Sequence, residues 1–299
     1  MQTFLTILPL IIIALTGYIC VRVKLFNKSQ IDSLSAICFN LLIPLFLFKT
    51  TYQTNLDIGI SYQWFLSFYI PVIFSYITVY LLYKFGFKLA NKKASLRALS
   101  ATYSNTVLVA IPIIATYLPA KTAGLAFIVI AFHSAILFSL TEFFVNKSIL
   151  SSFKKSLQNP IVLSILGGFI VNLLNLKIPE LLLEPFVALS KSAIPLALFG
   201  LGAAMYFLPI RGNLTTAFSF ALFKLLALPA FAFVTCRYGF NLNEAQTLIT
   251  VLLIASPTGV GAYVMATKHN AETDIAASTV VISTLLCTVS YLFWLEILI

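Results

Sequence analysis

Long apolar stretches, divided by short polar and charged clusters, run along the whole chain. A helix that crosses a membrane takes about 20 mainly apolar residues, and the polar clusters separate ten stretches of that order. We place them at residues 4 to 22, 31 to 51, 62 to 84, 98 to 118, 122 to 145, 159 to 176, 181 to 207, 214 to 237, 245 to 266 and 274 to 298. These stretches are too long for the strands of a membrane barrel and lack their alternation. The pattern therefore predicts an all-α integral membrane protein with ten transmembrane helices.

The composition agrees with this pattern. Hydrophobic residues make up 60% of the 299 positions, charged residues make up 9%, and the mean hydropathy is +1.01. Soluble proteins lie far from these values. The four cysteines have no metal-ligand or disulfide spacing, and the chain contains no phosphate-binding P-loop motif. We therefore expect no metal, no cofactor and no ATP-driven pump, and leave H+ and Na+ open as coupling ions.

The positive charges are distributed unevenly among the connections. A net charge of +10 would suggest nucleic acid for a soluble protein, but here 13 Lys and Arg follow odd-numbered stretches and four follow even-numbered ones. The 13 are Arg22, Lys24, Lys28, Lys84, Lys88, Lys92, Lys93, Arg97, Lys147, Lys154, Lys155, Arg211 and Lys268. Positive residues favour the cytoplasmic side. We therefore expect a multi-pass protein of the inner or plasma membrane, with both termini outside the cytoplasm and no nucleic-acid partner. Trp64 and Trp294, near predicted span ends, are expected to be interfacial anchors.

The second half of the chain repeats the first. An offset of 151 residues places Pro9 on Pro160, Gly17 on Gly168, and residues 43 to 48 on residues 194 to 199. Later parts match at offsets of 152 and 153. We therefore expect two repeats, 1 to 150 and 151 to 299, with five helices each. Because five is odd, the second repeat enters the bilayer from the opposite side, which gives the inverted architecture of many secondary transporters.

Two predicted spans combine polar residues with proline near their middle, and the second also contains glycine. Residues 98 to 118 carry Ser104, Asn105, Thr106 and Pro112, and residues 245 to 266 carry Ser256, Pro257, Thr258, Gly259 and Gly261. Proline removes a backbone donor and glycine weakens a helix, so these sites predict breaks whose dipole ends could face an anion. The alternative is a pair of proline kinks closed by Ser and Thr hydroxyls. Their equivalent placement in the two halves favours a transport site, with Asn105 as its main polar side chain.

These residues resemble the auxin efflux carrier family, which includes bacterial permeases. Asn105-Thr106 through Ile111-Pro112 is similar to the family's fourth-helix motif, and Pro257-Thr258 through Ala266 is similar to its ninth helix. Asn159-Pro160 with Gly167-Gly168 resembles the sixth helix, and residues 193 to 202 resemble the seventh. The similarity covers nearly the whole chain.

The resemblance implies a scaffold of helices 1, 2, 6 and 7 beside a mobile, elevator-like transport bundle of helices 3 to 5 and 8 to 10. It also implies that helices 4 and 9 are broken and cross, and that a substrate carboxylate binds beside the crossing. Carried over from the family, the substrate contacts fall on Asn105, Thr106, Pro257 and Thr258. We add residues near them as further candidate substrate-binding residues: Ser104, Ile111, Pro112, Ser256 and Gly261. The chain departs from the family at Val107 and Ala110, where glycine is common, and at Gly261, where asparagine is frequent, so the substrate stays open.

Four ionisable residues within the spans need partners or a cavity. Lys224 could neutralise an anionic substrate or bond to carbonyls freed by a helix break. Lys191 could face the cavity or pair with Glu184, and the pair is favoured. His133 could carry a proton or act as a satisfied neutral donor. Glu142 is expected to reach the interface.

The function that fits best is secondary transport of a small organic anion, such as an auxin-like or dicarboxylic acid, by alternating access. A channel or a transporter-like sensor on the same fold is the alternative. An intramembrane enzyme is not expected, because the two histidines form no catalytic or metal motif. The expected partners are the organic anion and the lipid bilayer, and a homodimer is left open.

Overall fold

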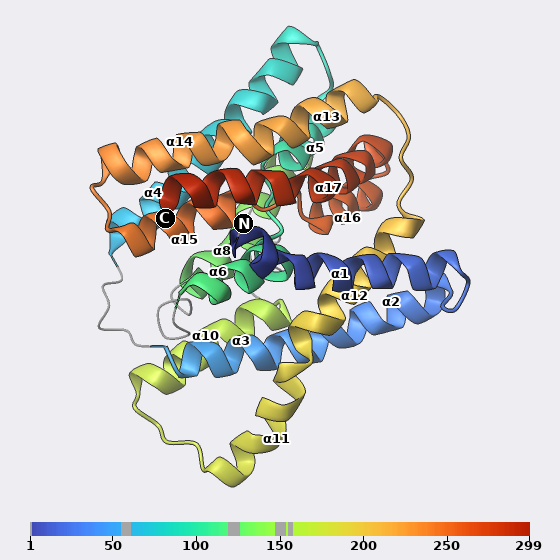
Figure 1. The fold of residues 1–299 in the computed structure, drawn as a ribbon. Helices are drawn as coiled ribbons and strands as arrows, with labels where there is room; N and C mark the ends of the chain where they lie inside the picture. The colour runs from blue at the N-terminus through green and yellow to red at the C-terminus, as the bar shows by residue number, and fades with distance from the viewer. Residues whose placement is uncertain (1, 55–60, 119–125, 147–153, 155–157) are drawn as a thin grey trace. The chain divides into compact units, whose positions relative to one another are not determined.

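The computed structural model describes residues 2–54, 61–118, 126–146, 154 and 158–299, and these form helices without a strand (Figure 1). The prediction of an all-helical protein is confirmed. Within the described ranges, six helical stretches are long and apolar enough to cross a membrane, and four further apolar helices are shorter. Each of the ten predicted segments overlaps one of these stretches, and the segments at 98 to 118 and 245 to 266 are each divided between separate helices. Residues 122 to 125, the start of the fifth predicted span, lie outside the described residues.

One compact unit comprises residues 1–59, 115–132 and 157–207. Its helices from the first half are α1 (Gln2–Arg22), α2 (Lys28–Ile37), the π-helical segment η1 (Cys38–Leu42) and α3 (Ile43–Tyr52). Its helices from the second half are α10 (Pro160–Leu173), α11 (Glu180–Lys191) and α12 (Ala193–Phe207). Within this unit, α1 packs against α12 and α10 packs against α3 (Figure 1).

The other compact unit comprises residues 60–114, 133–156 and 208–299. From the first half it takes α4 (Tyr62–Leu81), η3 (Leu82–Gly86), α5 (Asn91–Thr102) and η4 (Thr106–Ala110). From the second half it takes α13 (Leu214–Leu222), η5 (Phe223–Ala227), α14 (Leu228–Val234), η6 (Thr235–Gly239), α15 (Glu244–Ile254), α16 (Val260–Lys268) and α17 (Thr273–Leu298). Two helices, α6 (Ile111–Tyr117) and α8 (Ala126–Asn146), contribute residues to both units.

Polar side chains fix where several helices begin. Asn27, Ser61, Asn159, Asn213 and Asn243 each precede a helix and accept a hydrogen bond from a backbone N–H of its first turn. Such N-caps satisfy donors that have no partner inside the helix. The caps therefore explain why helices start at these positions.

The two halves repeat their local backbone geometry. Lys24 and Asn175, 151 residues apart, both have positive φ, at 63° and 52°. Lys88 and Asn241, 153 residues apart, also have positive φ, at 55° and 49°. The π-helical segments η3 and η6 precede the second pair, again 153 residues apart. Positive φ is uncommon in residues other than glycine, so the repeat extends to the conformation of the main chain.

Glycines bring helices of the two halves together within the first unit. A Cβ on Gly17 would lie 2.0 Å from the Phe199 carbonyl oxygen, and one on Gly168 would lie 2.6 Å from the Phe48 carbonyl oxygen. Phe48 and Phe199 are themselves 151 residues apart, so the two contacts are equivalent in the repeat. Only glycine allows backbones to approach this closely, as in other membrane helix pairs.

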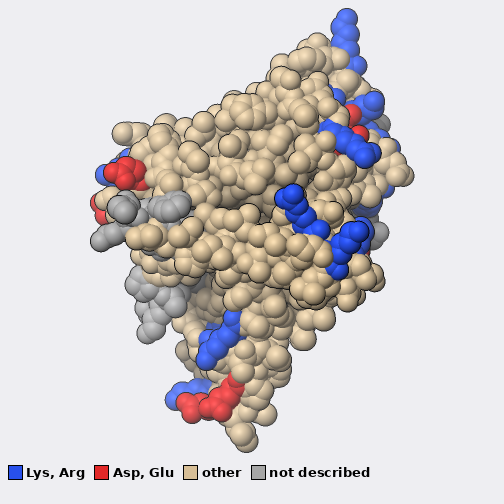
Figure 2. Space-filling view, turned by 45° about the vertical axis from the view of Figure 1, so that its right-hand side comes forward, with Lys and Arg blue, Asp and Glu red and all other residues tan. Residues whose placement is uncertain are grey.

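Apolar side chains cover much of the surface. Leu181, Phe85 and Val289 are 82%, 70% and 68% exposed. On the face drawn in Figure 2, charged side chains lie in a few separate groups and most of the surface is uncharged. Exposed apolar surface of this extent suits a lipid environment.

Candidate functional site

The first break lies between α5 and η4. The helix ends at Thr102, Tyr103 adopts an extended conformation with φ −73° and ψ 123°, and helical structure resumes at Thr106. Asn105 precedes the new helix with φ −81° and ψ 65°. Ser and Asn compete for backbone hydrogen bonds and so favour such interruptions. The predicted break is confirmed, and it lies upstream of Pro112.

The second break lies between α15 and α16, at residues 255–259. Pro257 has no N–H and disfavours a helical conformation for the residue before it, so the helix ends at Ile254 and resumes at Val260. A Cβ at position 259 would lie 2.6 Å from Cε1 of Tyr103. Glycine is therefore required where the two breaks touch.

The two breaks pair with each other through the main chain. The Asn105 N–H donates to the Pro257 carbonyl at 2.8 Å, and the Gly259 N–H donates to the Tyr103 carbonyl at 3.0 Å. Ser104 and Thr258 form an isolated antiparallel bridge between them. Each break therefore supplies hydrogen-bond partners for backbone groups of the other break that are no longer paired within a helix. Backbone groups in apolar surroundings need such partners.

The polar groups of the second break are satisfied within the protein. The Thr258 N–H donates to Ser283 Oγ at 2.9 Å, and Thr258 Oγ1 donates to the Ser100 carbonyl at 3.0 Å. Ser256 Oγ donates to the Leu253 carbonyl at 2.7 Å. Ser256 and Thr258 are fully buried, and their hydrogen bonds close this break.

The last carbonyls of α15 also have partners. The Leu252 carbonyl accepts from Tyr291 Oη at 3.3 Å, and the Ile254 carbonyl accepts from the buried Lys224 Nζ. A cation at the C-terminal end of a helix is favoured by the helix dipole. Lys224 was expected either to neutralise a substrate or to bond to a carbonyl freed by a helix break. In the structure its ammonium contacts such a carbonyl, that of Ile254.

The first break keeps unpartnered polar atoms. Six buried side-chain atoms in the described part of the chain have no hydrogen-bond partner, and three of them are Ser104 Oγ, Asn105 Nδ2 and His133 Nδ1. His133 belongs to this break because its Nε2 accepts from the Ser104 N–H at 3.0 Å. Buried polar groups are normally paired, since leaving them unpaired costs about 1–3 kcal/mol each. The first break is therefore a candidate binding site.

Comparison with known proteins identifies the family. The sequence model described as Membrane transport protein matches residues 3–149 and again residues 143–295. The chain belongs to this membrane transport protein family. The resemblance to the auxin efflux carriers is thereby confirmed, and each half of the chain matches the family separately. No curated protein matches the chain.

Other residues predicted for this transporter's site lie around the breaks. Thr106 begins η4 and is buried, whereas Ile111 and Pro112 lie in the first turn of α6, inside a regular helix. A Cβ on Gly261 would lie 2.7 Å from Cζ of Phe138 and 2.8 Å from Cε1 of Tyr103. The aromatic rings occupy the space where an asparagine side chain would lie. This explains why glycine stands at position 261.

Three expectations about the transporter's polar and aromatic residues are wrong. Lys191 is exposed at the end of α11, and no ion pair joins it to Glu184 in the described residues. Trp64 and Trp294 are not interfacial anchors, because both are buried. Their indole N–H groups donate to Thr250 Oγ1 at 2.8 Å and to the Leu225 carbonyl at 2.9 Å.

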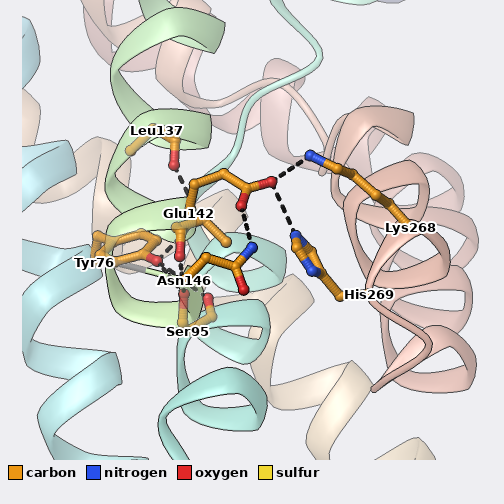
Figure 3. A network of polar contacts seen from close by, with 8 residues as sticks. Tyr76, Ser95, Leu137, Glu142, Asn146, Lys268 and His269 are labelled. Atoms are coloured by element: carbon orange, nitrogen blue, oxygen red, sulfur yellow. Dashed lines mark hydrogen bonds and ion pairs between the residues drawn. The ribbon is translucent and has the colours of Figure 1, made fainter. Parts of the chain in front are cut away.

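Glu142 does not reach the interface either; it is buried in an ion-pair network (Figure 3). Its Oε1 accepts from Lys268 Nζ and from His269 Nε2 at 3.0 Å, and its Oε2 accepts from Asn146 Nδ2 at 2.9 Å. Lys268 and His269 lie at the C-terminal end of α16, where cations are favoured. The network fixes the end of α16 to α8 within the second unit. The network could not be predicted from the sequence, since 126 residues separate Glu142 from Lys268.

A second ion pair holds the connection between α16 and α17. Arg97 Nε donates to Glu272 Oε2 at 2.6 Å, and the guanidinium lies 4.9 Å from the centre of the Tyr83 ring. Glu272 has positive φ at 57° and does not cap α17 with its side chain. Glu272 therefore forms an ion pair with α5 and does not cap α17 with its side chain.

Proposed function

We propose that this protein is a secondary transporter that moves a small organic anion across the cell membrane by alternating access. In this proposal all ten segments span the bilayer, the two halves are inverted, and the broken helices cross at the binding site. The protein works as an elevator, with the unit that contains both breaks moving as the transport bundle. The termini lie on the non-cytoplasmic side, as the distribution of Lys and Arg favours.

The observation that carries the proposal is the set of buried, unpartnered donors at the first break. Asn105 Nδ2 can only donate, and the Ser104 hydroxyl can donate. A guest that presents acceptors, such as a carboxylate, would complete both. The α16 N-terminus at Val260, directly after the second break, adds a positive dipole end. A site whose unpartnered groups donate hydrogen bonds favours an anion over a cation.

Symmetry supports the inverted arrangement. Asn105 and Pro257 are equivalent at an offset of 152 and bond to each other across an antiparallel bridge. A local two-fold axis brings equivalent residues together in this way. Each compact unit also draws matching segments from both halves of the chain. Inverted-repeat carriers have their sites at such positions.

Flux into proteoliposomes tests the function. We expect uptake of at least one acid from a panel of succinate, malate, benzoate and indole-3-acetate, with saturation kinetics. Imposed Na+ and H+ gradients identify the coupling ion by accelerating that uptake. Unitary currents in a planar bilayer would instead indicate a channel, and absence of flux with every acid would refute the proposal.

Asn105→Asp tests the site directly. The substitution keeps the size of the side chain but replaces its donors with a negative charge, so we expect at least about a hundredfold loss of affinity for the transported acid. Asn213→Asp is the matched control, because Asp also caps a helix N-terminus well. Binding is measured by the shift in thermal stability with acid concentration. Equal binding by both variants would remove Asn105 from the site.

A further inference from the structure

His133 is fixed from three sides at the first break. Its Nε2 accepts from the Ser104 N–H at 3.0 Å. Its ring stacks on Tyr103 with 5.1 Å between ring centres and 9° between planes, and Phe68 meets it edge-on at 5.5 Å. Tyr103 is itself held by a 2.7 Å hydrogen bond between its hydroxyl and Ser134 Oγ. With 1% of its surface exposed, the imidazole has little freedom to rotate.

The contact with Ser104 determines which ring nitrogen carries the proton. Because Nε2 accepts a hydrogen bond from a backbone N–H, it carries no hydrogen, and the proton of the neutral ring is on Nδ1. Protonation of Nε2 would place two donors against each other and break the contact. Nδ1–H is therefore a fixed donor, and it has no partner in the described part of the chain.

We infer that His133 is a ligand-binding residue whose Nδ1–H donates a hydrogen bond to the acceptor group of the transported anion, while its Nε2 holds the broken backbone at Ser104. This inference rests on the proposed function and adds a third donor to Ser104 and Asn105. It assigns His133 a role other than proton transfer, because the ring keeps one tautomer throughout. The site then recognises acceptors through three donors and rejects ligands that present only donors, such as amines.

Two substitutions separate the two nitrogens. Gln at position 133 places an amide where Nε2 lies, so His133→Gln can still accept from Ser104 but lacks the Nδ1 donor. Asn places its amide where Nδ1 lies, so His133→Asn keeps a donor there but leaves the Ser104 N–H without a partner. We expect His133→Gln to retain the parent Tm and to bind the best of the four acids about tenfold more weakly. We expect His133→Asn to lower the Tm.

The outcomes of the binding experiment are distinct. If no acid stabilises the parent, the proposed function fails and this inference fails with it. If the parent binds an acid and His133→Gln binds it equally well, only the inference is overturned. A lower Tm for His133→Gln than for His133→Asn would also overturn it.

Nitrogen-15 NMR of histidine-labelled protein tests the tautomer without a ligand. The chain has two histidines, so the spectrum of His133→Gln assigns the remaining signals to His269. We expect the His133 signals to show a protonated Nδ1 and a bare Nε2, and the Nδ1 signal to move when the acid is added. A protonated Nε2 in the free protein would overturn the inference.

Discussion

The two breaks occupy equivalent positions in the repeat but differ in how their polar groups are satisfied. At the second break, Ser256 and Thr258 donate to carbonyls and Lys224 closes the end of α15. At the first break, the side chains of Ser104 and Asn105 keep donors without partners. Ser104 and Ser256 make the contrast sharpest, because they are 152 residues apart and only the Ser256 hydroxyl has a hydrogen bond in the described residues.

The difference indicates a division of work between duplicated elements. A repeat supplies two breaks, and their pairing requires both to be present. The protein's own groups can then satisfy the hydrogen bonds of one break and make it rigid. The other break keeps unpartnered donors that a ligand could use. Pre-organised donors lose little on binding, because their surroundings already hold them in place. In the transport site that we propose, the second break would therefore stabilise the backbone, and the first break would bind the anion.

The largest effect is expected from a substitution that tests how tightly each break is packed. Gly259→Ala places a Cβ 2.6 Å and 2.8 Å from ring atoms of Tyr103 and 3.2 Å from the Ser104 carbonyl oxygen. We expect it to lower the free energy of unfolding in detergent by about 1–3 kcal/mol and to abolish transport. The equivalent position in the first half is Val107, which is half-buried in η4.

Val107→Ala is the matched control, and we expect it to cost less than about 1 kcal/mol. Thermal unfolding of the two variants beside the parent gives the comparison. Similar losses for both would show that the two breaks tolerate added or removed bulk alike, and the contrast in packing would not hold.

A smaller effect is expected at Lys224. Lys224→Met keeps much of the length of the side chain but leaves the Ile254 carbonyl without its donor, at a cost of about 1–3 kcal/mol. Removing a buried amine offsets part of this cost, so we expect a loss of about 1 kcal/mol. Affinity for the transported acid should stay within about threefold of the parent, because in the proposed site Lys224 stabilises the backbone of the second break and does not contact the acid.

The same binding assay decides between the roles of Lys224. A large loss of affinity with an unchanged Tm would make Lys224 a ligand contact and would move recognition to the second break. Lys224→Arg is the control that keeps a donor and a positive charge at this position.

The sequence predicted the elements better than their contacts. Polar residues with a proline indicated both breaks, and glycine added to the signal at the second, because these residues act on the local backbone. Pro112 shows the limit: it lies in the first turn of α6, where its missing N–H costs little, and the polar residues before it carry the break. Most outer bounds of the predicted spans lie close to those of the helices for a similar reason, since hydrophobicity is local in the chain. The fourth span is an exception, because α5 begins at Asn91, seven residues before the predicted start.

Tertiary partners could not be predicted from one sequence. The Leu225 carbonyl lacks its usual helical donor because Pro229, four residues later, has no N–H. The buried Trp294 donates to this carbonyl at 2.9 Å, and Ser290 also donates to it at 2.7 Å. Glu142 is buried because its partners arrive from α16. In both cases a residue typical of an interface is held inside by groups far away in the chain. The unpartnered state of His133 Nδ1 likewise depends on its packing.

The smallest effects give the cleanest test, because Ser104 and Ser256 are the same residue in equivalent places. Ser256→Ala removes a 2.7 Å hydrogen bond to the Leu253 carbonyl, so we expect a loss of about 0.5–1.5 kcal/mol in stability with unchanged affinity for the acid. Ser104→Ala removes a buried hydroxyl that has no partner in the described residues, so its stability should be unchanged or slightly higher. Its affinity should fall by a factor of about three to ten if the hydroxyl donates to the anion. Thermal unfolding with and without the acid measures both quantities, and identical profiles for the two variants would mean that the breaks are equivalent in chemistry as well as in position.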